Sequence, residues 1–192
     1  MGDIGYFQSI VEQPETFEYQ DKVDDSKLIL DEQFFFPTMK VSYVTICSNP
    51  YIISANEFHD EKTIQVINKL WFTLEDAVYE NVTNTTNILE LNSHGIDHED
   101  EVCIRFVLEL DDKISHISIS YDRTIKHFVK ISFLTTSGIN FSRGAITRSN
   151  TKTWKSDIQN QIIGVRSQVV KNMVTGEAEL DTLTILVNLC NH

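Results

Sequence analysis

The feature that most constrains this chain is a period-two alternation of apolar and polar residues between positions 102 and 189. Side chains of an extended strand point alternately to the two faces of a sheet, so each alternating run predicts a strand with one buried face. Several short runs separated by turn residues predict an all-β fold of antiparallel sheets. The residues expected to face the core are Ile104, Phe106, Leu108, Leu110, Ile117, Ile119, Tyr121, Val129, Ile131, Phe133, Leu183, Ile185, Val187 and Leu189.

The chain before residue 100 carries weaker strand patterns. β-branched and aromatic residues favour strands at 41–47, 51–58 and 63–70, and the residues between these runs favour turns. Segment 70–79 fits either a strand or a helix, and we expect a strand. The polar stretch 81–87 predicts a loop.

The first 36 residues differ from the rest in charge. They contain nine acidic and two basic residues, and their apolar residues follow no clean period. We expect residues 1–36 to form an acidic N-terminal arm and residues 37–192 to form the folded domain. The arm is either a solvated tail or a segment that folds against a partner through its few aromatic residues.

The overall charge limits the classes of partner. The formal net charge is -12 at pH 7, so nucleic acid and anionic lipid should repel the chain. No apolar run approaches the roughly 18 residues of a membrane span, and the N-terminal sequence does not resemble a secretory signal. We therefore expect a cytoplasmic protein with no membrane or nucleic-acid partner, either free or within a cytoskeletal or other large assembly.

The cysteines predict free thiols. Cys47, Cys103 and Cys190 lie far apart, form no C-x-x-C pair and leave an odd count. In a reducing compartment such cysteines are usually unpaired, so we expect neither a disulfide framework nor a zinc site.

The segment from Asn92 to Glu101 is rich in metal-type ligands. His94 and His98 lie there beside acidic residues, but a loop containing Gly95 would not fix their geometry. We expect a solvated connection, with no metal and no cofactor. The chain also lacks the nucleotide-binding, zinc-protease and serine-hydrolase motifs, so we expect no catalytic residues and no enzyme.

One segment reverses the charge of the chain. Residues 139–171 contain six basic residues and one acidic residue. The segment is either a solvated face or a docking surface for an acidic protein partner, because Trp and Arg are frequent hot-spot residues. The candidate interaction residues are Arg143, Arg148, Lys152, Trp154, Lys155 and Arg166.

The order and spacing of the later strands resemble a known family. The segments concerned are 111–112, 114–121, 128–135, 137–144, 162–167 and 180–187. Over residues 100–189 the chain resembles the jacalin-like lectin domain. The resemblance implies a β-prism of three Greek-key antiparallel sheets, here with the N-terminal acidic extension.

The resemblance also implies a sugar site. In the family, the Asp of a Gly-x-x-x-Asp loop before the last strand accepts hydrogen bonds from sugar hydroxyls, and neighbouring backbone amides assist. By this resemblance Asp181 would be the acceptor, with Glu179 and Leu180 beside it and Gly176 as the loop glycine. Gly176 lies five residues before Asp181, one more than in the family's loop.

Two functions remain open at this point. The first is a non-catalytic structural or protein-interaction component built on the lectin fold, which binds protein partners in a larger complex. It depends on the altered sugar loop, the acidic arm and the basic segment. The alternative is a cytoplasmic lectin that binds glycans through the Asp181 loop. A small hydrolase is a third option, for which no motif is present.

Overall fold

The computed structural model describes residues 7–9, 29–35, 39–53, 62–76, 88–109, 111–146, 150–157, 162–171 and 178–188. Every regular element in these segments is a β-strand, as the alternation predicted. None of the described residues forms a helix of the length and apolarity that crossing a membrane requires. The strands are β1 (Phe7–Ser9), β2 (Ile29–Phe34), β3 (Met39–Ile53), β4 (Lys62–Asp76), β5 (Ile88–Glu90), β6 (His94–Gly95), β7 (Val102–Val107), β8 (Ile114–Asp122), β9 (His127–Thr135), β10 (Asn140–Gly144), β11 (Thr151–Asp157), β12 (Ile162–Lys171) and β13 (Ala178–Asn188).

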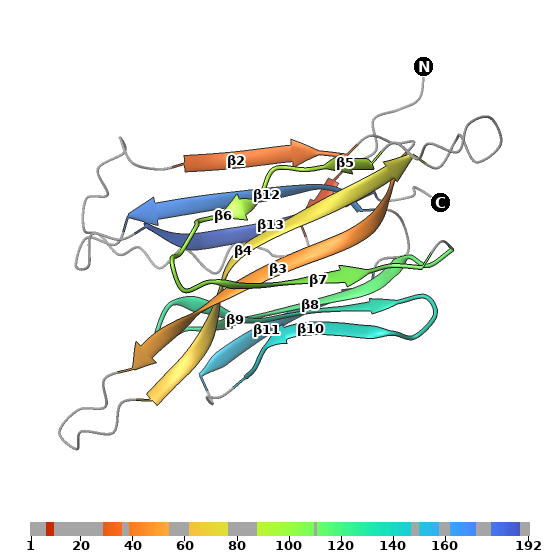
Figure 1. Cartoon of the computed structure of the whole chain (residues 1–192). Helices are drawn as coiled ribbons and strands as arrows, with labels where there is room; N and C mark the ends of the chain where they lie inside the picture. Colours follow the sequence, from red (N-terminus) through yellow and green to blue (C-terminus); the bar gives the residue numbers. More distant parts are fainter. Residues whose placement is uncertain are drawn as a thin grey trace.

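The described strands form three antiparallel sheets around a common interior (Figure 1). The terminal sheet has the order β1-β13-β12-β2, and the middle sheet has the order β10-β9-β8-β11. The hairpin sheet has the order β5-β4-β3-β7, with β6 also paired to β4. This confirms the expected architecture of three sheets.

A long hairpin of β3 and β4 dominates its sheet. The two strands pair from Met39 opposite Asp76 to Ile53 opposite Lys62. The segment that fitted either a strand or a helix is therefore a strand as far as Asp76, as expected. Its β-branched and aromatic residues suit a pleated, half-buried surface.

The acidic extension is not confirmed as a separate arm. The described parts of residues 1–36 are β1 and β2, which belong to the terminal sheet, and Phe35, which is buried in the main core. Strand β2 pairs with β12 along its length, with Glu32 opposite Arg166. The assignment of residues 1–36 to an arm and residues 37–192 to the domain stays a prediction, although these two strands complete the sheet that β12 and β13 begin.

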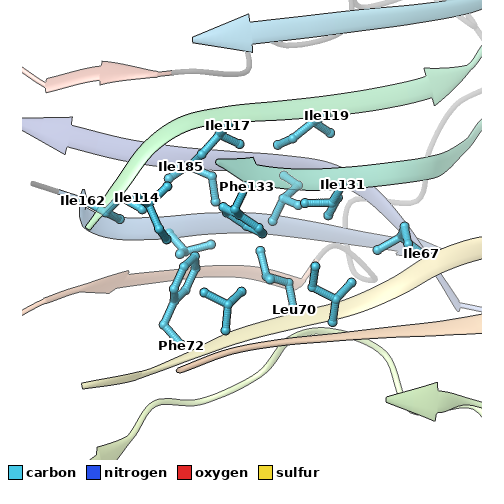
Figure 2. Close-up of a cluster of buried hydrophobic side chains, with 14 of the residues drawn as sticks. Ile67, Leu70, Phe72, Ile114, Ile117, Ile119, Ile131, Phe133, Ile162 and Ile185 are labelled. Atoms are coloured by element: carbon cyan, nitrogen blue, oxygen red, sulfur yellow. The ribbon is translucent and has the colours of Figure 1, made fainter. Parts of the chain in front are cut away.

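The main core lies where the three sheets face one another (Figure 2). Leu70 and Phe72 come from the hairpin sheet, Phe133 from the middle sheet and Ile185 from the terminal sheet. The rings of Phe72 and Phe133 meet edge to face with centroids 6.1 Å apart. Each fully buried side chain of this size stabilises the fold by about 1.5–3 kcal/mol, so the core ties the three sheets together.

A β-bulge changes which residues of β9 enter that core. The pairing of β8 with β9 shifts by one residue beyond Ser120, which leaves Val129 as the extra residue. Phe128 then joins the main core, whereas Val129 packs with Ile64 and Val66 in a second, smaller cluster. The prediction that Val129 shares a face and a core with Phe133 was wrong, because simple alternation contains no bulge.

The expected free thiols at Cys47 and Cys103 were also wrong. These residues are direct partners on β3 and β7, and their sulfur atoms form a disulfide. The sequence separation of 56 residues concealed the pair, because only the register of β3 against β7 brings the two positions together. Cys190 lies outside the described residues.

Candidate functional site

The candidate site begins at the first residues of β13. Leu180 pairs with Val169 and Thr182 pairs with Gln168, so Asp181 is the extra residue of a second β-bulge. Leu180 is buried in the core, whereas Asp181 stays partly exposed. A bulge turns a side chain out of the regular ladder, and here that side chain is the Asp181 carboxylate at the end of the prism.

The turn between β8 and β9 forms the second part of the site. The Asp122 carboxylate accepts hydrogen bonds from the backbone N–H groups of Thr124 (2.8 Å) and Ile125 (3.3 Å). Lys126 closes the turn in the left-handed region, with φ of 59°, and its N–H donates to the Asp122 carbonyl at 2.8 Å. In Figure 1 this turn and the start of β13 lie at the same end of the prism.

Aromatic rings lie beside the turn and the start of β13. The ring of His127 packs edge-on against Tyr51 with centroids 4.6 Å apart, and its Nε2 lies 3.9 Å from Glu179 Oε1. Tyr121 packs edge-on against Phe128 at 5.2 Å and remains partly exposed. The middle and hairpin sheets therefore contribute rings, and the carboxylates come from β13 of the terminal sheet and from Asp122 of the middle sheet.

The carboxylates of this region also interact electrostatically with the groups around them. Burial raises the pKa of Asp181, the negative charge of Glu179 raises it further, and the positive charge of Lys126 opposes them. A carboxylate of raised pKa holds its charge less firmly, so a ligand that donates hydrogen bonds would relieve an unfavourable state.

The same carboxylates shift the pKa values of two of the rings. Burial raises the pKa of Tyr121, and the charges of Asp181, Glu179 and Asp122 act in the same direction. Burial lowers the pKa of His127, although the charges of Glu179 and Asp122 oppose this, so burial favours the neutral imidazole. We call this group the end site; it consists of Tyr51, Tyr121, Asp122, Lys126, His127, Glu179 and Asp181.

The structure assigns different places to the four predicted sugar-site residues. Asp181 and Glu179 belong to the end site, and the side chain of Leu180 is buried in the core. Gly176 lies outside the described residues. The residues from the β8–β9 turn and from β3 were not predicted, because Tyr121 fitted the core alternation and no short-range pattern links it to Asp181.

The predicted basic docking residues lie on different strands. Arg143 is on β10 and Lys152 is on β11, at opposite edges of the middle sheet, whereas Arg166 is on β12 of the terminal sheet. Trp154 and Lys155 are on β11, where only their backbone is described, and Arg148 lies outside the described residues. Arg143 also serves the fold, because its Nε donates to Ser48 Oγ at 2.8 Å.

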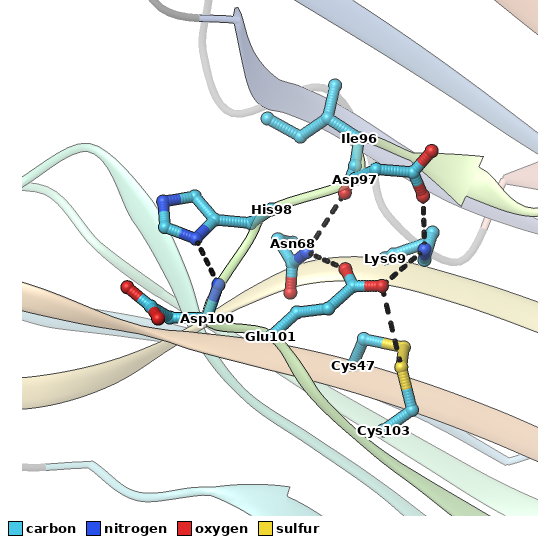
Figure 3. A network of polar contacts seen from close by, with 9 residues as sticks. All are labelled: Cys47, Asn68, Lys69, Ile96, Asp97, His98, Asp100, Glu101 and Cys103. Atoms are coloured by element: carbon cyan, nitrogen blue, oxygen red, sulfur yellow. Dashed lines mark hydrogen bonds and ion pairs between the residues drawn. A yellow bond between two sulfur atoms is a disulfide. The ribbon is translucent and has the colours of Figure 1, made fainter.

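A polar network on the hairpin sheet is the other concentration of charge (Figure 3). The buried Lys69 ammonium binds Asp97 and, at 2.7 Å, Glu101 Oε1. Asn68 donates to Glu101 Oε2 at 2.7 Å. Hydrogen bonds that satisfy a buried charge in this way are typical of a structural network, here one that holds the connection 96–101 on the sheet.

This network contains a geometric candidate for a metal, but its chemistry does not fit. Among the described residues, the potential ligand atoms of Cys47, Glu101 and Cys103 all lie within 4.8 Å of one another. The two sulfur atoms form a disulfide and are not thiolates, so they are not zinc ligands in this state.

The two histidines of the 92–101 segment have separate environments. His94 is buried on β6, and its Nδ1 lies 3.0 Å from Ser167 Oγ of the terminal sheet. His98 is partly exposed, and its Nδ1 accepts a hydrogen bond from the Asp100 N–H at 3.2 Å. The expectation of a solvated connection was therefore wrong for His94, which links two sheets.

Comparison with solved structures identifies the fold. No family model matches the chain, and no curated protein sequence matches it. Among solved structures, a prostate-specific WGA16 glycoprotein lectin matches with a TM-score of 0.52 and 12% identity, over 85% of this chain and 90% of that one. A single-chain recombinant jacalin matches with a TM-score of 0.50 and 11% identity, over 88% of this chain and 99% of that one. The three antiparallel sheets and these likenesses show that the chain has the β-prism fold of the jacalin-like lectins.

Proposed function

We propose that this chain is a non-catalytic carbohydrate-binding protein and that the glycan binds at the end site. The observation that carries the proposal is the position of Asp181 and Glu179 at the bulged start of β13, where Glu179 Oε1 lies 3.9 Å from Nε2 of the His127 ring of another sheet. Carboxylates accept paired hydrogen bonds from sugar hydroxyls, and aromatic rings pack against the apolar faces of sugars. Both similar structures are of proteins named as lectins or as jacalin, which agrees with this class of ligand.

Asp181 is the principal acceptor in this proposal. It is partly exposed, whereas Asp122 is 1% exposed and is already bound by the N–H groups of its own turn. Lys126 is exposed, its charge acts on Asp181, and its ammonium can donate to a ring or hydroxyl oxygen. Acceptors and a donor around one ring are sufficient to orient a neutral sugar.

The interpretation as a structural component of a larger complex receives less support. It depends on the altered sugar loop, on a separate acidic arm and on the basic segment. The described parts of residues 1–36 are strands of the terminal sheet, and the basic candidates lie on different edges and sheets. Protein partners, a larger assembly and the cytoplasmic location remain predictions without a test.

The test is a binding titration with mannose and galactose after a glycan-array screen. We expect saturable binding by the natural sequence and a loss of about tenfold or more in the Asp181→Asn variant, because the amide cannot accept charge-assisted hydrogen bonds. Asp111→Asn is the matched control, since Asp111 is exposed beyond the other end of β8. Absence of binding to any glycan, or equal binding by the Asp181→Asn variant, would refute the proposal.

A further inference from the structure

The disulfide of the hairpin sheet is accessible from one side. Cys103 lies on β7, the last strand in the order β5-β4-β3-β7, and is exposed, whereas Cys47 on β3 is fully buried. Thiol–disulfide exchange requires that a reductant reach one of the two sulfur atoms. A dissolved reductant therefore meets the bond at Cys103 and releases the Cys47 sulfur beneath it.

The strand register determines where the two sulfur atoms lie once this bond is broken. Cys47 and Cys103 are direct antiparallel partners, and the residue pairs on either side of them are in register too. Backbone hydrogen bonds make this ladder, so it does not depend on the disulfide. Side chains of direct partners share one face of the sheet with Cβ atoms about 4.5–5.5 Å apart, which lets two thiolates bind the same ion.

A carboxylate lies beside the two sulfur atoms. Cys103 Sγ is 3.8 Å from Glu101 Oε1, and the potential ligand atoms of Cys47, Glu101 and Cys103 all lie within 4.8 Å of one another. Glu101 is held in this place, because its Oε2 accepts a hydrogen bond from Asn68 Nδ2 at 2.7 Å. Zinc binds this combination of ligands, with bonds of about 2.3 Å to thiolate sulfur and about 2.0–2.2 Å to carboxylate oxygen.

Lys69 balances the charge of such a site. It is the partner of Cys47 on β4, and its ammonium lies 2.7 Å from Glu101 Oε1. In Figure 3 the Glu101 carboxylate lies between this ammonium and the disulfide. Two thiolates and one carboxylate carry three negative charges; a divalent cation leaves one of them, which Lys69 offsets. Lys69 also binds Asp97, so it keeps an anionic partner when Glu101 Oε1 turns to a metal ion.

We propose that reduction of the Cys47–Cys103 disulfide converts this part of the hairpin sheet into a binding site for a thiophilic divalent cation, with Cys47, Cys103 and Glu101 as its ligands. A dithiol reductant supplies two electrons and two protons to the disulfide and itself becomes a disulfide. The two thiols lose their protons to solvent as the cation binds, and the fourth coordination position is left for water.

The donor set also defines which cations are excluded. Thiolates are soft ligands that suit Zn²⁺ and Cd²⁺, whereas Ca²⁺ and Mg²⁺ take oxygen ligands. The oxidised chain offers the same Glu101 carboxylate but no thiolate at Cys47 or Cys103. Binding should therefore depend on the redox state of the chain, and it is independent of glycan binding at the end site.

The experiment titrates the full chain with Cd²⁺ before and after reduction, and then displaces Cd²⁺ with Zn²⁺. A phosphine is the reductant, because it gives two electrons to the disulfide, takes its oxygen from water and adds no competing thiol; its excess is removed without air. Cadmium–thiolate bonds absorb in the ultraviolet. We expect one Cd²⁺ per reduced chain, and binding at least about 100-fold weaker to the oxidised chain.

Matched substitutions assign the ligands. Glu101→Gln should weaken Cd²⁺ binding by about tenfold or more, and the amide oxygen still accepts from Asn68. Glu99→Gln is its control, because Glu99 is exposed in the same connection and should leave the affinity unchanged. Cys103→Ser should abolish the absorbance of the two-thiolate site, whereas Cys190→Ser should retain it.

The fold has to survive reduction for this site to exist. Circular dichroism monitors the reduced chain, and Cd²⁺ should raise its denaturant midpoint, with a smaller rise in Glu101→Gln, because an ion bound by the folded state stabilises that state. Absence of Cd²⁺ binding by the reduced chain would overturn the proposal. Equal binding by Glu101→Gln, loss of binding in Cys190→Ser, or binding only to an unfolded reduced chain would overturn it as well.

Discussion

Replacing Asp112 by alanine should destabilise the protein by about 2–4 kcal/mol, because this carboxylate holds the turn between β9 and β10. Asp112 is 6% exposed. Its Oδ1 accepts hydrogen bonds from the Ser137 N–H (2.9 Å) and from Thr136 Oγ1 (2.7 Å), and its Oδ2 accepts one from Ser137 Oγ (2.6 Å). The Lys113 N–H donates to Oδ1 at 3.1 Å.

The magnitude follows from the number and exposure of these donors. A hydrogen bond to a charged group contributes about 1.5–3 kcal/mol net, but four bonds to one carboxylate are coupled and do not add. Thr136 and Ser137 are exposed, so water can satisfy them once the carboxylate is gone. The cost is therefore nearer to that of one or two charged hydrogen bonds than of four.

The pH dependence gives an independent check on the same residue. Burial raises the pKa of Asp112, but the hydrogen bonds from Ser137, Thr136 and Thr135 outweigh burial and hold the pKa well below its usual range. A lowered folded-state pKa stabilises the protein above the unfolded value of about 4, and this contribution is lost as the pH falls through the folded pKa. The difference between the natural sequence and Asp112→Ala should shrink below about pH 4.

The assay is denaturant unfolding at pH 7 and across the acid range, with Asp111→Asn as the control. Asp111 is exposed and adjacent, so its substitution should change stability by less than about 0.5 kcal/mol. A cost below about 1 kcal/mol for Asp112→Ala, or a cost that does not change with pH, would refute the role of this carboxylate.

Three further predictions concern the fold. Phe133→Ala should destabilise by about 3–5 kcal/mol in denaturant unfolding, because the ring is fully buried where the sheets meet; a cost under about 1 kcal/mol would contradict the shared core. Reduction should lower stability by about 4 kcal/mol through loss of the Cys47–Cys103 link, as closing a loop of this length implies, and a double alanine variant should not respond to reductant. Burial lowers the pKa of Lys69, but its bonds to Asp97 and Glu101 raise it overall. The stability that the Lys69 ammonium gives the fold is therefore complete below about pH 10 and is lost as the pH rises above the folded-state pKa. Lys69→Met should cost about 2–4 kcal/mol at pH 7 by leaving the Glu101 carboxylate without its cation, and unchanged stability would show that the network is dispensable.

Local patterns in the sequence were sufficient for the strands and for the type of fold. Ile117, Ile119, Ile131 and Phe133 are buried as the alternation predicted, because side-chain direction along a regular strand depends only on period two. Val129 departed from the pattern because a bulge at that position depends on how β8 and β9 pair. The disulfide was missed for a related reason, since pairing of β3 with β7 joins residues far apart in the chain.

The end site was predictable only in part. Asp181 and Glu179 followed from the resemblance of the last strand to a lectin loop. The resemblance did not predict Tyr121, Lys126 or His127, because the packing of the middle sheet against the terminal sheet brings them to these carboxylates. Contacts between sheets are set by tertiary packing, which no window of consecutive residues records.

The most direct test of glycan binding at the end site is a two-dimensional NMR titration of the isotope-labelled chain with the tightest-binding sugar. The account predicts that the largest backbone shifts fall on residues 121–127 and 178–182, and that the Asp181→Asn variant shows none of them at the same sugar concentration. Shifts centred on β7, β10 or β11, or no shifts at saturating sugar, would contradict it.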